Sequence, residues 1–335
     1  MSNQKIFATA FLLTSVFVCS ANATPVWVNN ASAIDINMLS EQIMSFTHNS
    51  DRLSDFFKRI NEYGTMNRLN EYGGDGFDNS AILASHSQKG QLLKGVWIDA
   101  KHINANVHYS NHRSARTRYN LFGFGTTTKD LNLKYGDLSF GAFVAGISGN
   151  TAGTDTYGNS LGIFAKYNYK QFDAGLMLNN GSVNNKQEHI NFNNAWFNVA
   201  MDAHVKFKID NTLYFQPGIY AGYTWVSSDD LYIGGQTVTS KNSMFLNVAP
   251  SARFVKHIID DWYGAMSVKY VATFNNSNDI YINNIAMDGI SVDDYTQIST
   301  DVEYNYKNFT FTGAIQKQIG GFDGWAGNIK AKYLF

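Results

Sequence analysis

The chain has 335 residues, of which 44% are hydrophobic and 15% aromatic, and its formal net charge is −1. A nucleic-acid-binding protein is expected to carry an excess of basic residues, so this balance argues against that class. A disordered chain would be poor in aromatic residues, so the composition also argues against disorder. High aromatic content at ordinary mean hydropathy suits a protein whose apolar residues alternate with polar ones.

Residues 1–23 have the pattern of a secretory signal peptide. Lys5 is the positive charge, 6–18 is the apolar region, and Ala21-Asn22-Ala23 is a small-residue cleavage motif. The apolar region is shorter than the roughly 20 residues that a membrane-spanning helix needs. We therefore expect export through the Sec translocon and cleavage near Ala23, which would remove Cys19, the single cysteine. A mature chain without a thiol suits an oxidising compartment.

Residues 24–91 predict a helical segment followed by a linker. Apolar residues recur at intervals of three and four, first at Ile36, Leu39, Ile43 and Phe46 and then at Leu53, Phe56, Phe57 and Ile60. This spacing is typical of an amphipathic helix, and the polar residues 48–51 predict an interruption between its two parts. The glycines from Gly64 onward end the helical pattern.

From residue 92 to residue 335 the period of the pattern changes to two, which predicts β-strands. Residues 161–169 and 262–274, for example, alternate apolar with polar or small side chains. We count about twelve such segments of roughly ten residues, which is the even strand number and the length that membrane barrels use. The expected fold is an all-β transmembrane barrel, closed and antiparallel, with an N-terminal helix in its pore.

The lengths of the predicted connections give a second argument for a membrane barrel. Tight turns are expected at 168–171, 209–212, 257–261 and 307–308, and longer loops at 149–158, 179–191, 227–242 and 275–294. Short turns on one rim and long loops on the other are typical of outer-membrane barrels. The connection 128–136 is longer than this rule predicts.

Charged residues fall on the face of the strands that is predicted to be wet. These candidates for the pore lining are Lys166, Asp202, Lys206, Arg253, Lys269, Glu303, Lys330 and Lys332. A lysine on the lipid face would cost about 2–4 kcal/mol at mid-membrane, so their position in the alternation supports the assignment. Two interpretations stay open. The charges pair across the pore or with helix carboxylates such as Asp51 and Asp55, or their cationic excess makes an anion-leaning channel.

Three pieces of the barrel region resemble one family. GVWIDA opens the first strand, YFQPGIYAGYTWV lies in the middle, and GWAGNIKAKYLF ends the chain. In their order and spacing they are similar to the translocator domain of autotransporters. This resemblance implies a barrel placed in the outer membrane by the barrel-assembly machinery, with Phe335 and Tyr333 as the assembly signal. It also implies a pore helix, here within 50–63, and a monomer surrounded by outer-membrane lipid.

The chain departs from that pattern because almost no passenger precedes the helix, at most residues 24–49. Three functions therefore stay open: a translocator with a vestigial passenger, a small plugged porin-like channel, and a barrel whose surface loops act as an adhesin. Self-cleavage at Asn29-Asn30 is the only chemistry that the family resemblance raises, and chance explains this pair better. No enzyme activity, cofactor or metal is otherwise expected, because the histidines are scattered and His102 and His108 read as lumenal or rim residues.

Overall fold

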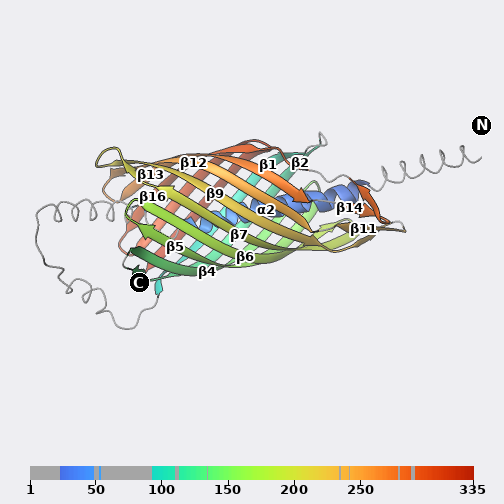
Figure 1. The fold of residues 1–335 in the computed structure, drawn as a ribbon, viewed down its shortest axis with the longest axis horizontal. Coiled ribbons are helices and arrows are strands. Elements are labelled where there is room, and N and C mark those ends of the chain that lie inside the picture. The colour runs from blue at the N-terminus through green and yellow to red at the C-terminus, as the bar shows by residue number, and fades with distance from the viewer. Residues whose placement is uncertain are drawn as a thin grey trace, which may run out of the picture.

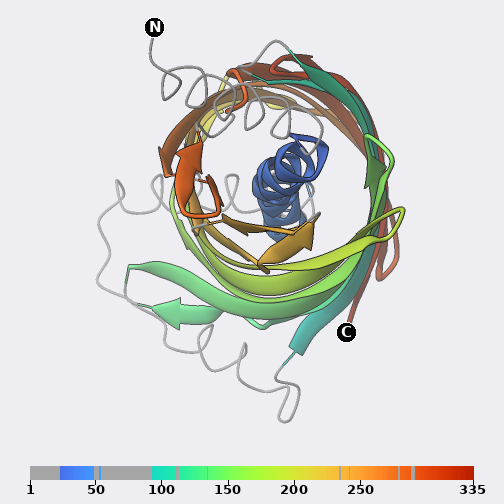
Figure 2. The ribbon, with the colours of Figure 1, turned by 90° about the vertical axis from the view of Figure 1, so that its right-hand side faces the viewer.

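The computed structural model describes residues 23–48, 53, 93–109, 113–133, 135–233, 235–240, 242–277, 280–287 and 291–335. Twelve long antiparallel strands close into a barrel around the helix α2 (Ala23–His48), as Figures 1 and 2 show. The strands are β1 (Leu93–His108), β2 (Ser114–Thr128), β4 (Gly136–Thr151), β5 (Thr154–Tyr169), β6 (Phe172–Gln187), β7 (Ile190–Val205), β9 (Leu213–Ser228), β12 (Ser243–Ile259), β13 (Trp262–Ser277), β16 (Tyr295–Tyr306), β17 (Phe309–Gly320) and β18 (Phe322–Leu334).

The first and last strands, β1 and β18, pair with each other and close the barrel. Each of the other long strands pairs with its neighbours along the chain, and β9 pairs directly with β12. Closure leaves no long strand with an unpaired edge, which is the way a membrane barrel satisfies its backbone. The predicted closed, twelve-stranded antiparallel barrel with a helix inside is confirmed.

Six short strands extend the barrel at its two ends. At the end where β18 finishes, here called the C-terminal rim, β3 (Leu131–Leu133) pairs with β4 and β8 (Phe207–Lys208) pairs with β9. At the opposite end, here called the loop rim, β10 (Leu231–Ile233), β11 (Gln236–Ser240), β14 (Ile280–Ile282) and β15 (Ile285–Met287) form a separate four-stranded sheet. Figure 1 places this sheet beside the N-terminal end of α2.

The alternation of the strands separates an apolar outer face from a buried inner one. On β5, Leu161 and Ile163 are each 56% exposed, whereas Phe164 and Lys166, which alternate with them, are buried. Toward the loop rim the outward positions become polar, as on β6, where Asn180, Ser182 and Asn184 follow the apolar residues. The apolar belt therefore surrounds the part of the barrel nearer the C-terminal rim. Strand ends project beyond it on the loop side.

Aromatic side chains border this belt on both sides. Trp262, Phe309 and Phe335 are exposed beside the C-terminal rim, and Trp225 and Trp325 are the last outward apolar residues of their strands on the loop side. Rings at both borders of an apolar belt are typical of barrels surrounded by lipid, because an aromatic ring suits the boundary between hydrocarbon and water. Among the described residues, no helix is both long and apolar enough to cross a membrane.

The predicted contrast between tight turns and long loops is correct only in part. Residues 149–158 and 179–191, expected as loops, are strand ends joined by two-residue turns at 152–153 and 188–189. Polar residues such as Asn184 and Asn193 continue the ladder there, because strand pairing needs only backbone groups. In the part of the barrel that the structure describes, the two longest connections are 229–242 and 278–294, which both lie at the loop rim and contain the four-stranded sheet.

The structure describes a lumenal helix earlier in the chain than the segment assigned to the pore, at Ala23–His48. The predicted pore helix within 50–63 lies outside the described residues except for Leu53, which is helical and buried against Tyr214 and Val255 of the wall. The helix ends at His48, where the polar interruption was predicted, and Pro25 sits in its first turn, where a missing N–H costs no hydrogen bond. Residues 1–22, and with them the predicted signal peptide, lie outside the described residues.

Candidate functional site: the interior of the barrel around the helix

The middle of α2 is surrounded by protein on every side. Every residue from Ala33 to Met44 is buried, the polar residues among them included. A helix of a soluble protein would keep one polar face in water, so a helix buried all round must find partners for its polar side chains in the wall. The contacts of α2 therefore decide how firmly it is held.

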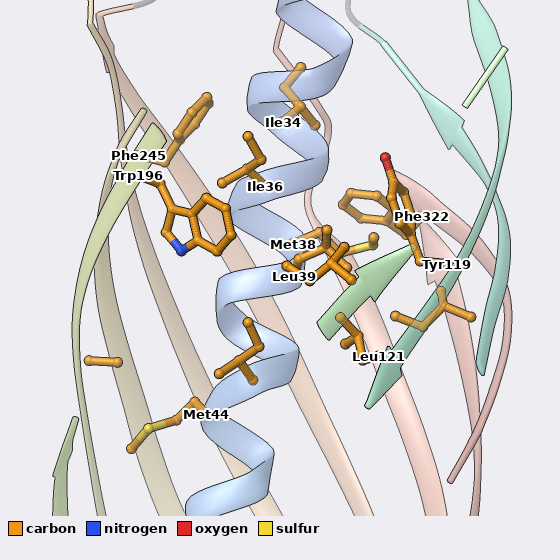
Figure 3. Packing of buried hydrophobic residues seen from close by; sticks show 14 of the residues in the cluster. Ile34, Ile36, Met38, Leu39, Met44, Tyr119, Leu121, Trp196, Phe245 and Phe322 are labelled. Carbon is orange, nitrogen blue, oxygen red and sulfur yellow. The ribbon is translucent and has the colours of Figure 1, made fainter. Parts of the chain in front are cut away.

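The apolar side chains of α2 pack against large residues that point inward from the wall. Figure 3 shows Ile36 on the side of Trp196 and Phe245, and Met38 and Leu39 on the side of Phe322. The same cluster also contains Ile34, Ile43, Met44, Trp97, Tyr119, Leu121 and Phe143. Burying a side chain of this size is worth about 1.5–3 kcal/mol, so this packing gives most of the attraction between helix and barrel.

Glycines in the wall make room for inward-pointing rings beside the helix. Gly141 on β4 lies opposite Phe164 on β5, and Phe143 on β4 lies opposite Gly162 on β5. A Cβ at Gly141 would be 2.0 Å from Cζ of Phe164, and one at Gly162 would be 2.3 Å from Cζ of Phe143. Since real Cβ atoms essentially never come this close, each ring occupies the space that a side chain on the next strand would need. The rings thereby lie against the wall and leave the axis of the barrel to α2.

An amide pair joins the helix to β12. Asn37 Nδ2 donates to Asn247 Oδ1 at 3.1 Å, and Asn247 Nδ2 donates to Asn37 Oδ1, also at 3.1 Å. The two side chains are 6% and 2% exposed, so each one satisfies the other in a place that water does not reach. A reciprocal pair of this kind fixes both the rotation and the height of the helix, because a shift of one residue would leave two amides unsatisfied.

One helical turn further on, Glu41 is the charged anchor of the helix. Its carboxylate forms an ion pair with Lys269 on β13 and accepts a hydrogen bond from the hydroxyl of Tyr295 on β16. Beside it, Lys101 on β1 donates to the side-chain oxygen of Gln42. A buried carboxylate is tolerated only when it is paired and hydrogen-bonded, and both conditions hold here.

Asp35 makes the corresponding contact nearer the loop rim. Its Oδ2 accepts hydrogen bonds from Thr151 Oγ1 at 2.6 Å and from Tyr119 Oη at 3.1 Å. Thr151 also lies 2.9 Å from Thr117, so the contact is part of a small hydroxyl network that joins β2 and β4. The helix is thus held through Asp35, Asn37 and Glu41 by three different parts of the wall.

A chamber of about 260 Å³ lies beside the C-terminal end of α2, on the side of the C-terminal rim. Its charged side chains are largely paired. Lys206 forms an ion pair with Asp173, His204 Nε2 lies 2.9 Å from Asp202 Oδ2, and Arg253 lies 3.2 Å from Asp301. Its remaining charged residues are Glu41, Lys101, Lys166 and Lys269. Cations and acids of similar number line the chamber, so its charge is mixed.

The structure places five of the eight predicted pore-lining residues at this chamber: Lys166, Asp202, Lys206, Arg253 and Lys269. The other three are buried at 2–3% exposure. Glu303 accepts the backbone N–H of Leu53 at 2.9 Å, and Lys330 lies over the ring of Trp97 at 5.3 Å from its centre. The third of these buried residues is Lys332.

One of the predicted wall cations has an acidic partner on the helix. Lys269 pairs with a carboxylate of the helix, as expected of the wall cations, and this carboxylate is Glu41. The pairing named for Asp51 and Asp55 lies outside the described residues. His102, expected in the lumen or at the rim, is exposed on the outer face of β1, and its Nδ1 is 2.8 Å from Asn120 Oδ1. In the described part of the chain, no group of three or more His, Cys, Asp and Glu residues is placed to hold a metal ion.

Sequence reasoning missed the residues that anchor the helix. Asn247 lies on the strand face that was recognised as polar, but its partner Asn37 was not singled out, and neither was Glu41. The alternation of polar and apolar residues signals only that Asn247 faces inward. Which of the many polar residues it meets depends on the height and rotation of the helix.

The fold and its interior define a class of protein: a closed, twelve-stranded membrane β-barrel of the outer-membrane type, whose lumen is occupied by its own N-terminal helix. No family model matches the sequence, and no curated protein matches it either.

Among solved structures, the chain is similar to three autotransporter domains. With the transport unit of AIDA-I from Escherichia coli the TM-score is 0.62 and the identity 13%, over 74% of this chain and 92% of that one. With the beta domain of BrkA from Bordetella it is 0.61 at 11% identity, over 72% and 99%. With the translocator domain of NalP from Neisseria meningitidis it is 0.58 at 9% identity, over 76% and 93%. At these identities the likeness shows a shared fold.

Proposed function

We propose that this protein is an autotransporter-type barrel of the Gram-negative outer membrane, which carries its own N-terminal segment through the pore and displays it at the cell surface. The observation that carries the proposal is the path of α2. The helix begins at the loop rim, runs along the lumen and is held there by Asp35, Asn37 and Glu41. The fold shared with translocator domains of autotransporters supports it.

The proposal includes an orientation. The projecting strand ends and the small sheet face the outside, and the C-terminal rim, with Phe335, faces the periplasm. A polar outer surface on one side of the apolar belt supports this direction, because outer-membrane barrels carry their larger connections outside and short turns in the periplasm. Sec export, assembly by the barrel-assembly machinery and a monomeric state are parts of the same proposal.

Cysteine labelling in intact cells tests both the display and the orientation. In a Cys19→Ser background, Asn29→Cys puts a thiol near the start of α2, Tyr232→Cys puts one on the exposed loop-rim strand β10, and Gln171→Cys puts one in a turn of the C-terminal rim. A membrane-impermeant maleimide should label the first two in intact cells and Gln171→Cys only after lysis. Labelling of Tyr232→Cys without Asn29→Cys would contradict display, and labelling of Gln171→Cys alone would contradict the orientation.

Translocation itself needs a passenger. An unstructured epitope inserted between Ala23 and Thr24 should be detected by antibody on intact cells. The epitope is inserted both into the unaltered barrel and into the Glu41→Ala variant, and the antibody signals are compared at equal amounts of folded protein. If the epitope is found only after lysis while Tyr232→Cys is labelled from outside, the barrel is correctly placed and does not translocate. A plugged channel is then the better explanation.

The plugged channel ranks second because α2 fills the lumen and the chamber carries mixed charge. An anion-leaning pore would require the helix to leave and the cations to lose their acid partners. Planar-bilayer recordings distinguish the two functions. A channel should open spontaneously with an anion preference, whereas a helix-sealed translocator should conduct little until residues 23–48 are deleted.

A further inference from the structure

A hollow of about 790 Å³ lies on the outer face of the barrel, where the first and last strands meet. We call it the seam groove. It extends across β16, β17, β18, β1 and β2, with the small residues Ala100, Gly313 and Gly327 as its floor and Ile315, Ile329 and Phe122 as its walls. It lies within the apolar belt, on the outer face of the wall, whereas the contacts of Asp35, Asn37 and Glu41 lie on the inner face.

The strand register explains why the hollow forms. Two neighbouring rows of outward residues cross the seam, and small residues alternate with large ones in both. In the first row Gly327 lies between Ile315 and His102, and in the second Ile329 lies between Gly313 and Ala100. Ile329 is 74% exposed and stands as a ridge between the small residues. An elongated apolar chain fits such a relief better than it fits a flat wall.

Polar and cationic side chains border the groove on the side of the loop rim. His102 and Asn120, joined by their 2.8 Å contact, form its edge. Arg118 and Arg116 follow at the next outward positions of β2, in steps of about 7 Å along the strand, and both are exposed. Arg116 Nε donates to Asn104 Oδ1 at 3.2 Å.

The charge of this border is positive. Asp323, two strands from Arg116, forms an ion pair with Lys317 at 2.6 Å. Asp155, two strands from Arg118, lies opposite Lys186, so each acid has a cation beside it and the charge of the two arginines remains. Lys317 also lies over Trp325, 5.4 Å from the ring centre, at the border of the apolar belt. The surface thus offers an apolar groove, a hydrogen-bonding edge and two guanidinium groups in order toward the loop rim. A phosphorylated lipid carries the matching groups in the same order: acyl chain, polar backbone and phosphate.

We propose that the seam groove binds one molecule of the phosphorylated glycolipid of the outer leaflet, with an acyl chain over Gly313 and Gly327 and a phosphate on Arg116 and Arg118. The choice of leaflet rests on the proposed function, since the arginines lie on the loop-rim side that the proposal turns outward. Arginine suits this role because its planar group binds phosphate with two parallel hydrogen bonds.

The groove can be filled without disturbing the barrel. A Cβ at Gly313 would meet nothing within 4 Å, and one at Gly327 would meet only the backbone oxygen of Ala314 at 3.8 Å. Gly327→Leu should therefore block the groove while the fold is retained. Ser182→Leu on β6 is the matched control, because Ser182 is exposed on the same outer face and lies three strands away from β2, outside the groove.

Native mass spectrometry of the purified barrel with lipid A tests the proposal, with phosphatidylglycerol and phosphatidylethanolamine as competitors. The wild type should retain one lipid A in preference to both phospholipids. The double variant Arg116→Gln/Arg118→Gln should bind roughly thirtyfold more weakly. Gly327→Leu should lose binding as well. Ser182→Leu and Lys186→Gln, which alter exposed outer residues of β6, should match the wild type.

Equal retention by all variants would overturn the site, and retention of phosphatidylglycerol as strong as that of lipid A would overturn the assigned lipid. A heat-shift gel of each variant shows that the barrel is folded. Because lipid binding is measured on purified protein and display by labelling in cells, each proposal can fail while the other stands.

Discussion

Asn37 on the helix and Asn247 on the wall bind each other through both of their amide groups, at 3.1 Å in each direction. Both side chains are buried, so water does not replace either partner, and the pair acts as a single buried unit. Together with the contacts of Asp35 and Glu41, this pair gives α2 one register in a lumen whose remaining contacts with the helix are mostly apolar.

The first prediction concerns that pair. Asn37→Ala and Asn247→Ala should each lower the free energy of unfolding by about 1–3 kcal/mol, because each leaves a buried amide unsatisfied. The double variant should lose clearly less than the sum, since it removes both groups at once. Urea unfolding in detergent measures the cycle. Additive losses would mean that the two amides do not act together.

The second prediction reverses the charge of the anchor on the helix. Glu41→Lys places a cation against Lys269 and removes the acceptor of the Tyr295 hydroxyl. It should therefore weaken the binding of α2 in the lumen by about 3 kcal/mol or more. Bilayer recordings should then show frequent openings, and α2 should become sensitive to protease. Glu188→Lys in an exposed turn is the control. A variant that stays as closed as the wild type would show that the apolar packing alone retains the helix.

The third prediction tests the recesses for the inward rings. Gly162→Ala forces the ring of Phe143 away from the wall and should destabilise the barrel by about 1–3 kcal/mol, the usual cost of overpacking. Gly146→Ala, where a Cβ is free of neighbours, should change little. The temperature at which the folded band disappears in a heat-shift gel measures both. Equal shifts for the two variants would mean that a side chain is tolerated at the recess.

The fourth prediction concerns the end of the chain. The backbone N–H of Phe335 donates to Lys94 O at 3.1 Å, and its ring stands at 84° to that of Tyr333 with the centres 5.6 Å apart. Deletion of Phe335 should lower the amount of folded barrel in the outer membrane several-fold, whereas Phe335→Trp should keep most of it. If the truncated chain assembles normally, Phe335 is not the assembly signal.

The fifth prediction concerns pH at the turn before β9. Asp210 accepts hydrogen bonds from the backbone N–H of Thr212 at 2.6 Å, from its hydroxyl at 2.9 Å and from the N–H of Leu213 at 2.9 Å, and these bonds lower the pKa of its carboxyl. A lowered pKa in the folded state means that the carboxylate stabilises the turn above the pKa of the unfolded chain. That contribution is lost as the pH falls through the lower, folded value.

An NMR titration of the Asp210 carboxyl in detergent checks the sign, with the same carboxyl in an unfolded peptide of residues 206–216 as the reference. Asp210 should release its proton at the lower pH. Titration at or above the reference value would contradict the role of the three hydrogen bonds. The Asp210→Asn variant should show a looser turn at neutral pH, visible as faster amide exchange of Thr212.

The sequence by itself determined the barrel, because strand alternation is a local property. Each of Phe335, Tyr333, Ile329 and their neighbours obeys a period of two, and a chain with apolar residues on one face of twelve strands has few ways to hide them other than in lipid. The same local rule found Lys166, Lys206 and Lys330, which the structure places on the inner side. Because a charged side chain is costly in hydrocarbon, charged residues are kept off the lipid-facing positions, and the alternation shows which positions these are.

Only the tertiary structure decided what fills the middle. Trp97, Phe143 and Phe164 face inward, since glycines on neighbouring strands and the apolar side of α2 give these rings a dry place. Nor could the sequence say that the segment 23–48 lies in the lumen, because two segments share the same spacing of three and four, and helical period alone does not say which one enters the pore. That choice depends on contacts between residues 210 positions apart, as between Asn37 and Asn247. No local pattern encodes such contacts.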